Sequence, residues 1–241
     1  MVSEKNNNKV GILGGMGPEA TVLLMARIID LTDVKDDSDH VPLVVDSNTK
    51  VPSRIKALIE KTGKSPGPIL VEMAKGLEKS GAKALAMPCN TAHYYAEMIK
   101  ESVDIPLLNM IELTAKEISK QKLPSNKVGI LASPAVEITR LFDDALSSYK
   151  IEALYPSKQS QMLKVIRSIK ENNKGNGVCE IINSAATELN EKGADIILIA
   201  CSELSLVLDC LQSSYVVIDS MDVLSKAVIN FSNNGRQFNL K

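Results

Sequence analysis

Short, uninterrupted apolar runs alternate with longer amphipathic stretches along most of the chain. Such runs are typical of strands buried on both faces of a parallel sheet, and the stretches between them have the period of helices. The predicted strands are, in chain order, residues 10–13, 43–46, 84–87, 107–109, 128–131, 151–154, 196–200 and 216–218. The clearest predicted helices are residues 18–31, 68–80 and 90–100, and residues 63–68 and 172–177 are predicted surface loops. This alternation predicts an α/β fold.

The pattern also repeats within the chain. Three segments of the first half match the second half in the same order and at nearly constant spacing: residues 9–13 with 127–131, 81–89 with 193–201, and 105–109 with 215–219. We therefore interpret the chain as two copies of one α/β unit, each with its own parallel sheet. If the copies face each other, one cleft lies between them.

The composition argues against several classes of partner. The formal net charge is −1 and there is no long basic run, whereas proteins that bind nucleic acid or a membrane surface present a positive patch. No apolar stretch reaches the roughly 18 residues of a membrane span. The opening MVSEKNNNKV lacks the apolar segment of a secretory signal. We therefore expect a cytoplasmic protein that binds neither nucleic acid nor membrane.

The four cysteines, Cys89, Cys179, Cys201 and Cys210, are expected to be free thiols in that reducing compartment. They form no C-x-x-C pair and the chain has only two histidines, so we expect no metal site. We interpret Cys179 and Cys210 as small buried apolar residues, as most isolated cysteines are.

Cys89 and Cys201 are different because they occupy matching positions in the repeat. Each follows a predicted strand and precedes residues that favour helix starts, Asn90 and Thr91 in one half and Ser202 in the other. Ligands of parallel sheets bind beyond the carboxyl ends of the strands, and a helix N-terminus there lowers the pKa of a thiol and accepts a carboxylate. Both cysteines are therefore candidate thiolates that face one cleft from opposite sides.

Two opposed thiols suit a reaction that inverts the α-carbon of an amino acid without a metal or cofactor. One thiolate removes the α-proton from one face, and one thiol returns a proton to the other face. The carbanion needs hydrogen-bond donors around its carboxylate, which the helix starts and the side chains of Asn90, Thr91 and Ser202 could supply.

The glycine-rich loop at residues 11–21 (GILGGMGPEAT) matches a dinucleotide-binding loop only weakly. Residues 15–20 fit G-x-G-x-x-A, but Pro18 would intrude in the phosphate turn and Asp46 is poorly spaced for a ribose. We interpret the loop as one that brings the backbone close to a small ligand.

Three further features allow more than one interpretation. Arg54 could hold a carboxylate bidentately or be a solvated cation at a helix start. Any of the lysines between Lys158 and Lys174 could close over the cleft, although most must be surface charges. His93 could buffer or cap, or be a hydrogen-bonded histidine on a helix surface, and the second interpretation is favoured.

At these motifs the chain resembles the aspartate/glutamate racemase family, in its aspartate-racemase-like branch. The motifs are GILGGMGPEAT at 11–21, MPCNTAH at 87–93 and ACSEL at 200–204, and the resemblance extends over roughly residues 9–232. It implies racemisation of an amino acid without PLP or another cofactor, in a cleft between two pseudo-symmetric α/β domains of a homodimer. The resemblance also implies roles for single residues: Cys89 and Cys201 as the acid/base pair, Met16, Gly17, Asn90, Thr91 and Ser202 against the substrate, and Arg54 on its side-chain carboxylate.

The resemblance further implies that the chain crosses between domains, with residues 1–103 plus 212–241 in one and residues 104–211 in the other. This chain departs from the family pattern at Ala200, Ser202 and Ser53, where Gly, Thr and an acidic residue are usual. Ser202 keeps the hydroxyl, whereas Ser53 leaves the substrate preference open. One methylene in a pocket is worth only ~1–3 kcal/mol, so aspartate and glutamate are not distinguished.

Three other functions fit parts of this pattern. A related isomerase or decarboxylase acting on a diacid is one, although such decarboxylation can run with a single cysteine. A non-catalytic binding protein for a small ligand is another, but it leaves two strand-end cysteines without a role. A nucleotide-dependent oxidoreductase depends only on the weak glycine pattern. The paired thiols favour racemisation.

Overall fold

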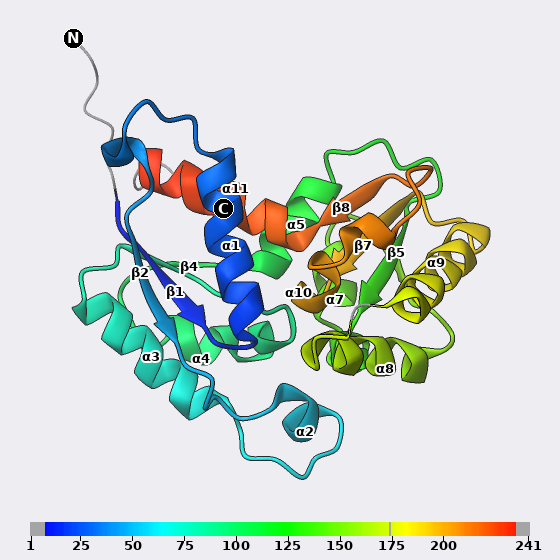
Figure 1. The fold of residues 1–241 in the computed structure, drawn as a ribbon, viewed down its shortest axis with the longest axis horizontal. Helices are drawn as coiled ribbons and strands as arrows, with labels where there is room; N and C mark the ends of the chain where they lie inside the picture. The colour runs from blue at the N-terminus through cyan, green and yellow to red at the C-terminus, as the bar shows by residue number, and fades with distance from the viewer. Residues whose placement is uncertain (1–7, 174, 235–241) are drawn as a thin grey trace.

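The computed structural model describes residues 8–173 and 175–234, and it forms two lobes (Figure 1). Each lobe has a parallel four-stranded sheet, and the predicted α/β fold is confirmed. The first sheet has the order β2-β1-β3-β4, with β1 at Val10–Gly14, β2 at Leu43–Ser47, β3 at Ala84–Ala86 and β4 at Leu107–Leu108. The second has the order β6-β5-β7-β8, with β5 at Lys127–Ala132, β6 at Glu152–Leu154, β7 at Ile196–Ala200 and β8 at Val217–Asp219. Every predicted strand is present to within one residue at each end.

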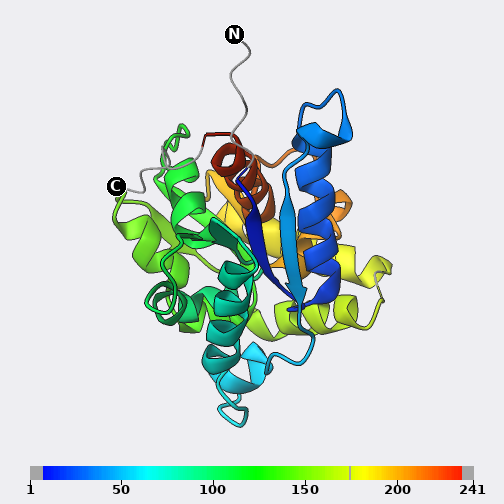
Figure 2. The same ribbon diagram turned by 90° about the vertical axis from the view of Figure 1, so that its left-hand side faces the viewer.

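Helices cover both faces of each sheet because successive side chains of a strand point to opposite faces. Val10 and Ile12 pack against α1 (Pro18–Leu31) and α11 (Ser220–Asn234), whereas Leu13 packs against α3 (Gly67–Lys79). Figure 2 shows α1 and α3 on opposite sides of this sheet. The second sheet has α8 (Gln159–Lys170) and α9 (Asn176–Glu191) on one face, and α5 (Met110–Ile118) and α7 (Leu141–Ser147) on the other.

Short helices complete the fold: α2 (Arg54–Leu58), α4 (Ala96–Lys100), α6 (Pro134–Ile138), α10 (Ser202–Ser205), and the 3₁₀ helices η1 (Asp37–Asp39), η2 (Thr91–Tyr95) and η3 (Leu208–Cys210). The predicted helix 18–31 is α1, 68–80 is α3 shifted by one residue, and 90–100 is η2 followed by α4. Both predicted loops end earlier than expected, because α3 begins at Gly67 and α9 at Asn176. Residue 174 of the second loop, the opening residues 1–7 and the end of the C-terminal segment, 235–241, lie outside the described residues. Within the described part of the chain, no helix is both long and apolar enough to cross a bilayer.

The repeat found in the sequence corresponds to two lobes with the same strand order. Helix packing explains why a glycine occupies the same position in the first strand of each lobe. A Cβ on Gly11 would lie 3.0 Å from the Cβ of Leu77 on α3, and one on Gly129 would lie 2.8 Å from the Cβ of Leu189 on α9. Matching glycines therefore let matching helices approach the first strand of each sheet.

The last helix of each half packs in the other half. Met221, Leu224 and Phe231 of α11 follow the second sheet but pack in the core of the first. Helix α5 follows the first sheet, and its residues Ile111 and Ile118 pack in the core of the second. In Figure 1, α11 runs from the end of β8 across to the first lobe. The domain boundaries expected at 103/104 and 211/212 precede β4 and β8, so the crossings lie a few residues later, after the last strand of each sheet.

Two of the four cysteines are joined, which corrects the expectation of four free thiols. Cys179 at the start of α9 and Cys210 in η3 form a disulfide with a Cα–Cα distance of 4.8 Å. The Nδ2 of Asn183 donates to the carbonyl oxygens of both cysteines, at 2.9 and 2.6 Å. The separation of 31 residues concealed this proximity, which depends on η3 folding back against α9. Cys89 and Cys201 are free thiols, as predicted.

Candidate active site

The two free thiols line one cavity at the carboxyl ends of both sheets. Cys201 directly follows β7, and Cys89 follows β3 after two residues. The cavity has a volume of about 280 Å³, at the small end for ligand sites, which suits a metabolite better than a nucleotide. It is lined by Gly15, Met16, Gly17, Thr49, Val51, Ser53, Arg54, Ile55, Cys89, Thr91, Ser133, Ile166, Lys170, Cys201 and Glu203. The duplicated halves thus bring the predicted thiol pair together.

Cys201 is held as a protonated thiol. Its Sγ donates a hydrogen bond of 3.1 Å to Oε2 of Glu203. Burial raises the pKa of the Cys201 thiol well above its usual range, and the Glu203 carboxylate raises it further. The expectation that a helix N-terminus makes this thiol a thiolate is therefore wrong for Cys201. The helix that it caps, α10, has only 4 residues, so its dipole is too weak to offset burial and a neighbouring carboxylate.

Glu203 is in turn paired with Lys170, the last residue of α8. Burial favours the neutral form of each, but their mutual attraction prevails. The pKa of Lys170 is raised and the pKa of Glu203 is lowered. The ionised form of either Cys201 or Cys89 would raise the pKa of Lys170 further, so this ammonium lies within electrostatic reach of both sulfurs. Among the lysines between Lys158 and Lys174, the structure places Lys170 at the cavity.

Arg54 opens α2 and is aimed into the cavity by backbone carbonyls. Its Nη2 donates to the carbonyl oxygen of Met16 at 3.0 Å, and its Nη1 donates to that of Pro52 at 3.1 Å. Peptide oxygens carry no full charge, so the guanidinium remains positive toward the cavity.

The glycine loop packs against the chain itself as well as lining the cavity. Gly15 has φ 84°, and a Cβ there would lie 2.4 Å from the carbonyl carbon of Asn48. Its N–H donates to the hydroxyl of Thr21 at 2.9 Å. Met16 and Gly17 therefore reach the cavity on a tightly held turn.

Two predicted substrate contacts, Asn90 and Ser202, are buried and are not among the residues that line the cavity. Asn90 is 2% exposed, and its Nδ2 donates to Oγ of Ser220 at 3.1 Å, which fixes the Cys89 loop to the start of α11. Ser202 is buried with its Oγ 3.4 Å from Oε2 of Glu203. Thr91, in contrast, lines the cavity.

His93 is buried and not on a helix surface, which corrects the interpretation from sequence. Its Nε2 accepts a hydrogen bond from the backbone N–H of Met110 at 3.1 Å, so its Nδ1 carries the proton and donates to the Cys89 carbonyl oxygen at 2.9 Å. Burial lowers the pKa of His93 to about 4, and the ring is neutral at physiological pH. It positions the Cys89 loop through the backbone.

Sequence reasoning gave no role to Glu203 or Ser133. Glu203 lies two residues after a candidate thiol, and that spacing was the available signal. Ser133 follows β5 as Gly15 follows β1, so the repeat pointed to it. Within the described residues, no group of three or more His, Cys, Asp or Glu side chains could share a metal ion.

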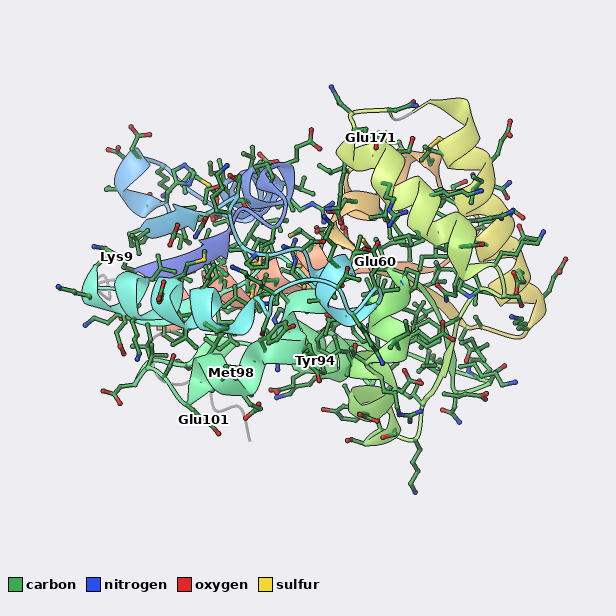
Figure 3. The ribbon with its side chains drawn as sticks, turned by 90° about the horizontal axis from the view of Figure 1, so that it is seen from below. Lys9, Glu60, Tyr94, Met98, Glu101 and Glu171 are labelled. Carbon is green, nitrogen blue, oxygen red and sulfur yellow. A yellow bond between two sulfur atoms is a disulfide. The ribbon has the colours of Figure 1, made fainter. Side chains whose placement is uncertain are left out.

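The segment after α2 connects the rim of the cavity to the second lobe. Glu60 accepts a hydrogen bond of 2.9 Å from Nη2 of Arg167 on α8. In Figure 3, Glu60 lies between the two lobes, while Tyr94 and Met98 lie on the underside of the first. Both partners of the ion pair are largely exposed, so its contribution is of the order of 1 kcal/mol or less.

The comparisons with known proteins agree with this geometry. The family described as Asp/Glu/Hydantoin racemase matches residues 13–228. The broad specificity amino-acid racemase RacX of Bacillus subtilis is 29% identical over 226 residues, covering 92% of this chain and 96% of its own. The structure of Picrophilus torridus aspartate racemase is 30% identical and superposes with a TM-score of 0.83, over 93% of this chain and 94% of that one.

A glutamate racemase from Francisella tularensis, in complex with D-glutamate, shares the fold at a TM-score of 0.66 and 16% identity, over 95% of this chain and 82% of its own. At that identity the likeness concerns the fold alone. The family match covers most of the chain, and it includes the segments that carry both thiols. This chain belongs to the Asp/Glu/hydantoin racemase family and is an amino-acid racemase.

Proposed function

We propose that the protein racemises an acidic amino acid, with aspartate as the first candidate, by proton transfer between two cysteines and without a cofactor. One observation carries the proposal. Cys89 and Cys201, from matching positions of the two lobes, line a single small cavity together with the cations Arg54 and Lys170. Opposed sulfurs suit inversion, and two cations suit a substrate with two carboxylates.

Because Cys201 holds its proton, we assign it as the acid and Cys89 as the base in the first step. Once deprotonated, Cys89 takes the α-proton, and the electron pair of the broken C–H bond moves into the α-carboxylate. The S–H of Cys201 then gives its proton to the opposite face of the α-carbon, which leaves a thiol at Cys89 and a thiolate at Cys201. The other enantiomer follows the same steps in reverse.

The cavity supplies polar groups for the charge that develops in this reaction. Arg54 and Lys170 provide positive charge, and the hydroxyls of Thr91 and Ser133 provide hydrogen-bond donors. Arg54 is held by backbone carbonyls and Lys170 by an ion pair before the substrate arrives, and such preorganisation is what stabilises a carbanion.

Broad specificity is a second candidate because Lys170 is already paired with Glu203. Discrimination for a side-chain carboxylate would then depend on Arg54, whose partners in the structure are peptide oxygens. The relatives include one protein named an aspartate racemase and one named a broad-specificity racemase, so both substrate ranges have precedent.

The test is racemisation of L-aspartate, L-glutamate and L-alanine in D2O without added PLP, followed by chirality and α-deuterium content. The wild type is compared with Cys89→Ala, Cys201→Ala and Arg54→Met. We expect D-aspartate labelled at the α-carbon, with inversion reduced at least about 100-fold in either cysteine variant. Arg54→Met should lower kcat/KM for aspartate far more than for alanine.

Retention of full inversion by either cysteine variant would overturn the two-thiol mechanism. Two results together would favour broad specificity over an acidic substrate. The wild type would racemise alanine as fast as aspartate, and Arg54→Met would lower kcat/KM equally for both amino acids.

A further inference from the structure

Each oxygen of the Glu203 carboxylate accepts a hydrogen bond from a different side chain. One oxygen, Oε2, accepts the S–H of Cys201 at 3.1 Å, and the other, Oε1, accepts from Nζ of Lys170. The side chain of Glu203 is only 10% exposed and Cys201 is buried, so the contact with the sulfur is shielded from water, whereas the Lys170 side chain is 37% exposed. A carboxylate fixed at both oxygens has one orientation, and that orientation directs one oxygen at the sulfur.

The two halves of the site differ at this position. The alignment that pairs Cys201 with Cys89 pairs Glu203 with Thr91, whose hydroxyl is neutral. Duplication therefore produced two thiols in matching places, and only one of them has an adjacent carboxylate two residues along the chain. The sulfurs are equivalent in position and unequal in charge environment.

Other charged and titratable groups face Cys201 from the surrounding elements. Lys170 comes from α8, Arg54 from α2 and Cys89 from the first lobe, and all three line the same cavity. Behind α10, Ser205 donates to Asp219 at 2.8 Å, and Asp219 is neutralised by Arg27 at 2.6 Å. Of these groups, Glu203 hydrogen-bonds the Cys201 sulfur directly.

We propose that Glu203, oriented by Lys170, is a positioning residue that keeps the proton on Cys201 and so makes Cys89 the base in the resting enzyme. The inference deepens the proposed function and rests on it for its catalytic meaning. The enantiomer whose α-proton faces Cys89 reacts with the resting form. The other enantiomer requires that Cys201 first lose its proton and that Cys89 gain one, by exchange with water.

Titration of the Cys201 thiol tests this without any substrate. In Cys89→Ala the only free thiol is Cys201, because Cys179 and Cys210 are joined, and the ultraviolet absorbance of the thiolate reports its ionisation. Adding Glu203→Gln removes the acceptor charge and leaves Lys170 unpaired beside the sulfur. We expect the apparent pKa of Cys201 to fall by about one to three pH units.

Two further variants separate positioning from a structural role. Lys170→Met in the same background leaves the carboxylate uncompensated, so the pKa of Cys201 should stay high or rise, opposite to the effect of Glu203→Gln. Glu203→Asp should restore part of the wild-type value. Glu188→Gln is the matched control, because Glu188 is paired with Lys192 on α9 and does not line the cavity.

In enzyme with both cysteines, Glu203→Gln should move the basic limb of the pH profile of kcat/KM to lower pH. An unchanged Cys201 titration in Glu203→Gln, or shifts of the same sign in Glu203→Gln and Lys170→Met, would overturn the inference. If the titrations shift as expected but neither acidic amino acid is racemised, the positioning role stands and the proposed substrate fails.

Discussion

The Nε2 of His93 accepts the backbone N–H of Met110 at 3.1 Å, while its other nitrogen donates to the carbonyl of Cys89. One neutral imidazole thus joins the loop that carries Cys89 to the first residue of α5, the helix that crosses to the second lobe. Protonation would turn the accepting nitrogen into a donor facing another donor, so this contact can exist only with the neutral ring.

Stability should therefore fall in acid through His93. Its pKa is about 4 in the folded protein against 6.5 when unfolded, so the unfolded chain binds the extra proton between these values. The contribution is fully present above pH 6.5 and is lost as the pH falls toward 4, up to about 3 kcal/mol. Urea unfolding at several pH values measures it. His93→Gln should show a flatter dependence on pH, and parallel curves for the two proteins would contradict this prediction.

Arg27→Met should destabilise the fold strongly. Arg27 on α1 donates to Asp219 at 2.6 Å, to Asp222 at 2.8 Å and to the Ser205 carbonyl at 3.2 Å. Asp219 is buried, and removing its partner leaves an uncompensated charge, which costs about 3–5 kcal/mol. Combining Arg27→Met with Asp219→Asn should recover much of the loss in a double-mutant cycle. If the destabilisation of the double variant equals the sum of those of the two single variants, the two residues are not energetically coupled.

Loss of the disulfide should lower the free energy of unfolding by about 3 kcal/mol, because Cys179 and Cys210 close a loop across 31 residues. The double substitution of both cysteines by serine is compared with the wild type in urea. Reductant should lower the stability of the wild type toward that of the variant and leave the variant unchanged. If the free energy of unfolding of the wild type stays the same after its disulfide has been fully reduced, the expected contribution is contradicted.

Gly15→Ala should disturb the cavity wall. The added Cβ would overlap the backbone of Asn48 at a residue with φ 84°, so the turn carrying Met16 must move, at a cost of roughly 1–3 kcal/mol. We expect kcat/KM of Gly15→Ala to fall even at temperatures where the variant remains folded, so the loss of stability alone does not explain the loss of activity. Gly76→Ala is the control, because Gly76 lies on α3 and a Cβ added there would have no neighbouring atom of the described residues within 4 Å. That change should leave activity intact and stabilise the helix by up to about 1 kcal/mol.

The strands, their grouping into two similar lobes and the thiol pair were predictable because they depend on local patterns. Uninterrupted apolar runs mark β1 and β7, and repeated segments such as residues 9–13 mark the duplication. The strand-end positions of Cys89 and Cys201 then placed both sulfurs at one edge.

The remaining features depend on contacts between distant segments. The disulfide needs η3 to lie against α9, and the burial of His93 needs α5 to begin beside it. The protonation of Cys201 was mispredicted because a helix-terminus argument takes no account of Glu203 and Lys170, which belong to different helices. Asn90 and Ser202 have the right sequence neighbours, but their side chains hydrogen-bond Ser220 and Glu203 and do not line the cavity.

The crossing of α5 and α11 gives the two lobes a shared folding transition. Each sheet has one apolar face closed by a helix that follows the other sheet, so a chain cut between the two copies would leave that face of each fragment exposed to water. Separate fragments should be insoluble alone and should regain structure only when mixed, as complementing halves. A molecule built from two matching units should therefore unfold in a single step and not one unit at a time.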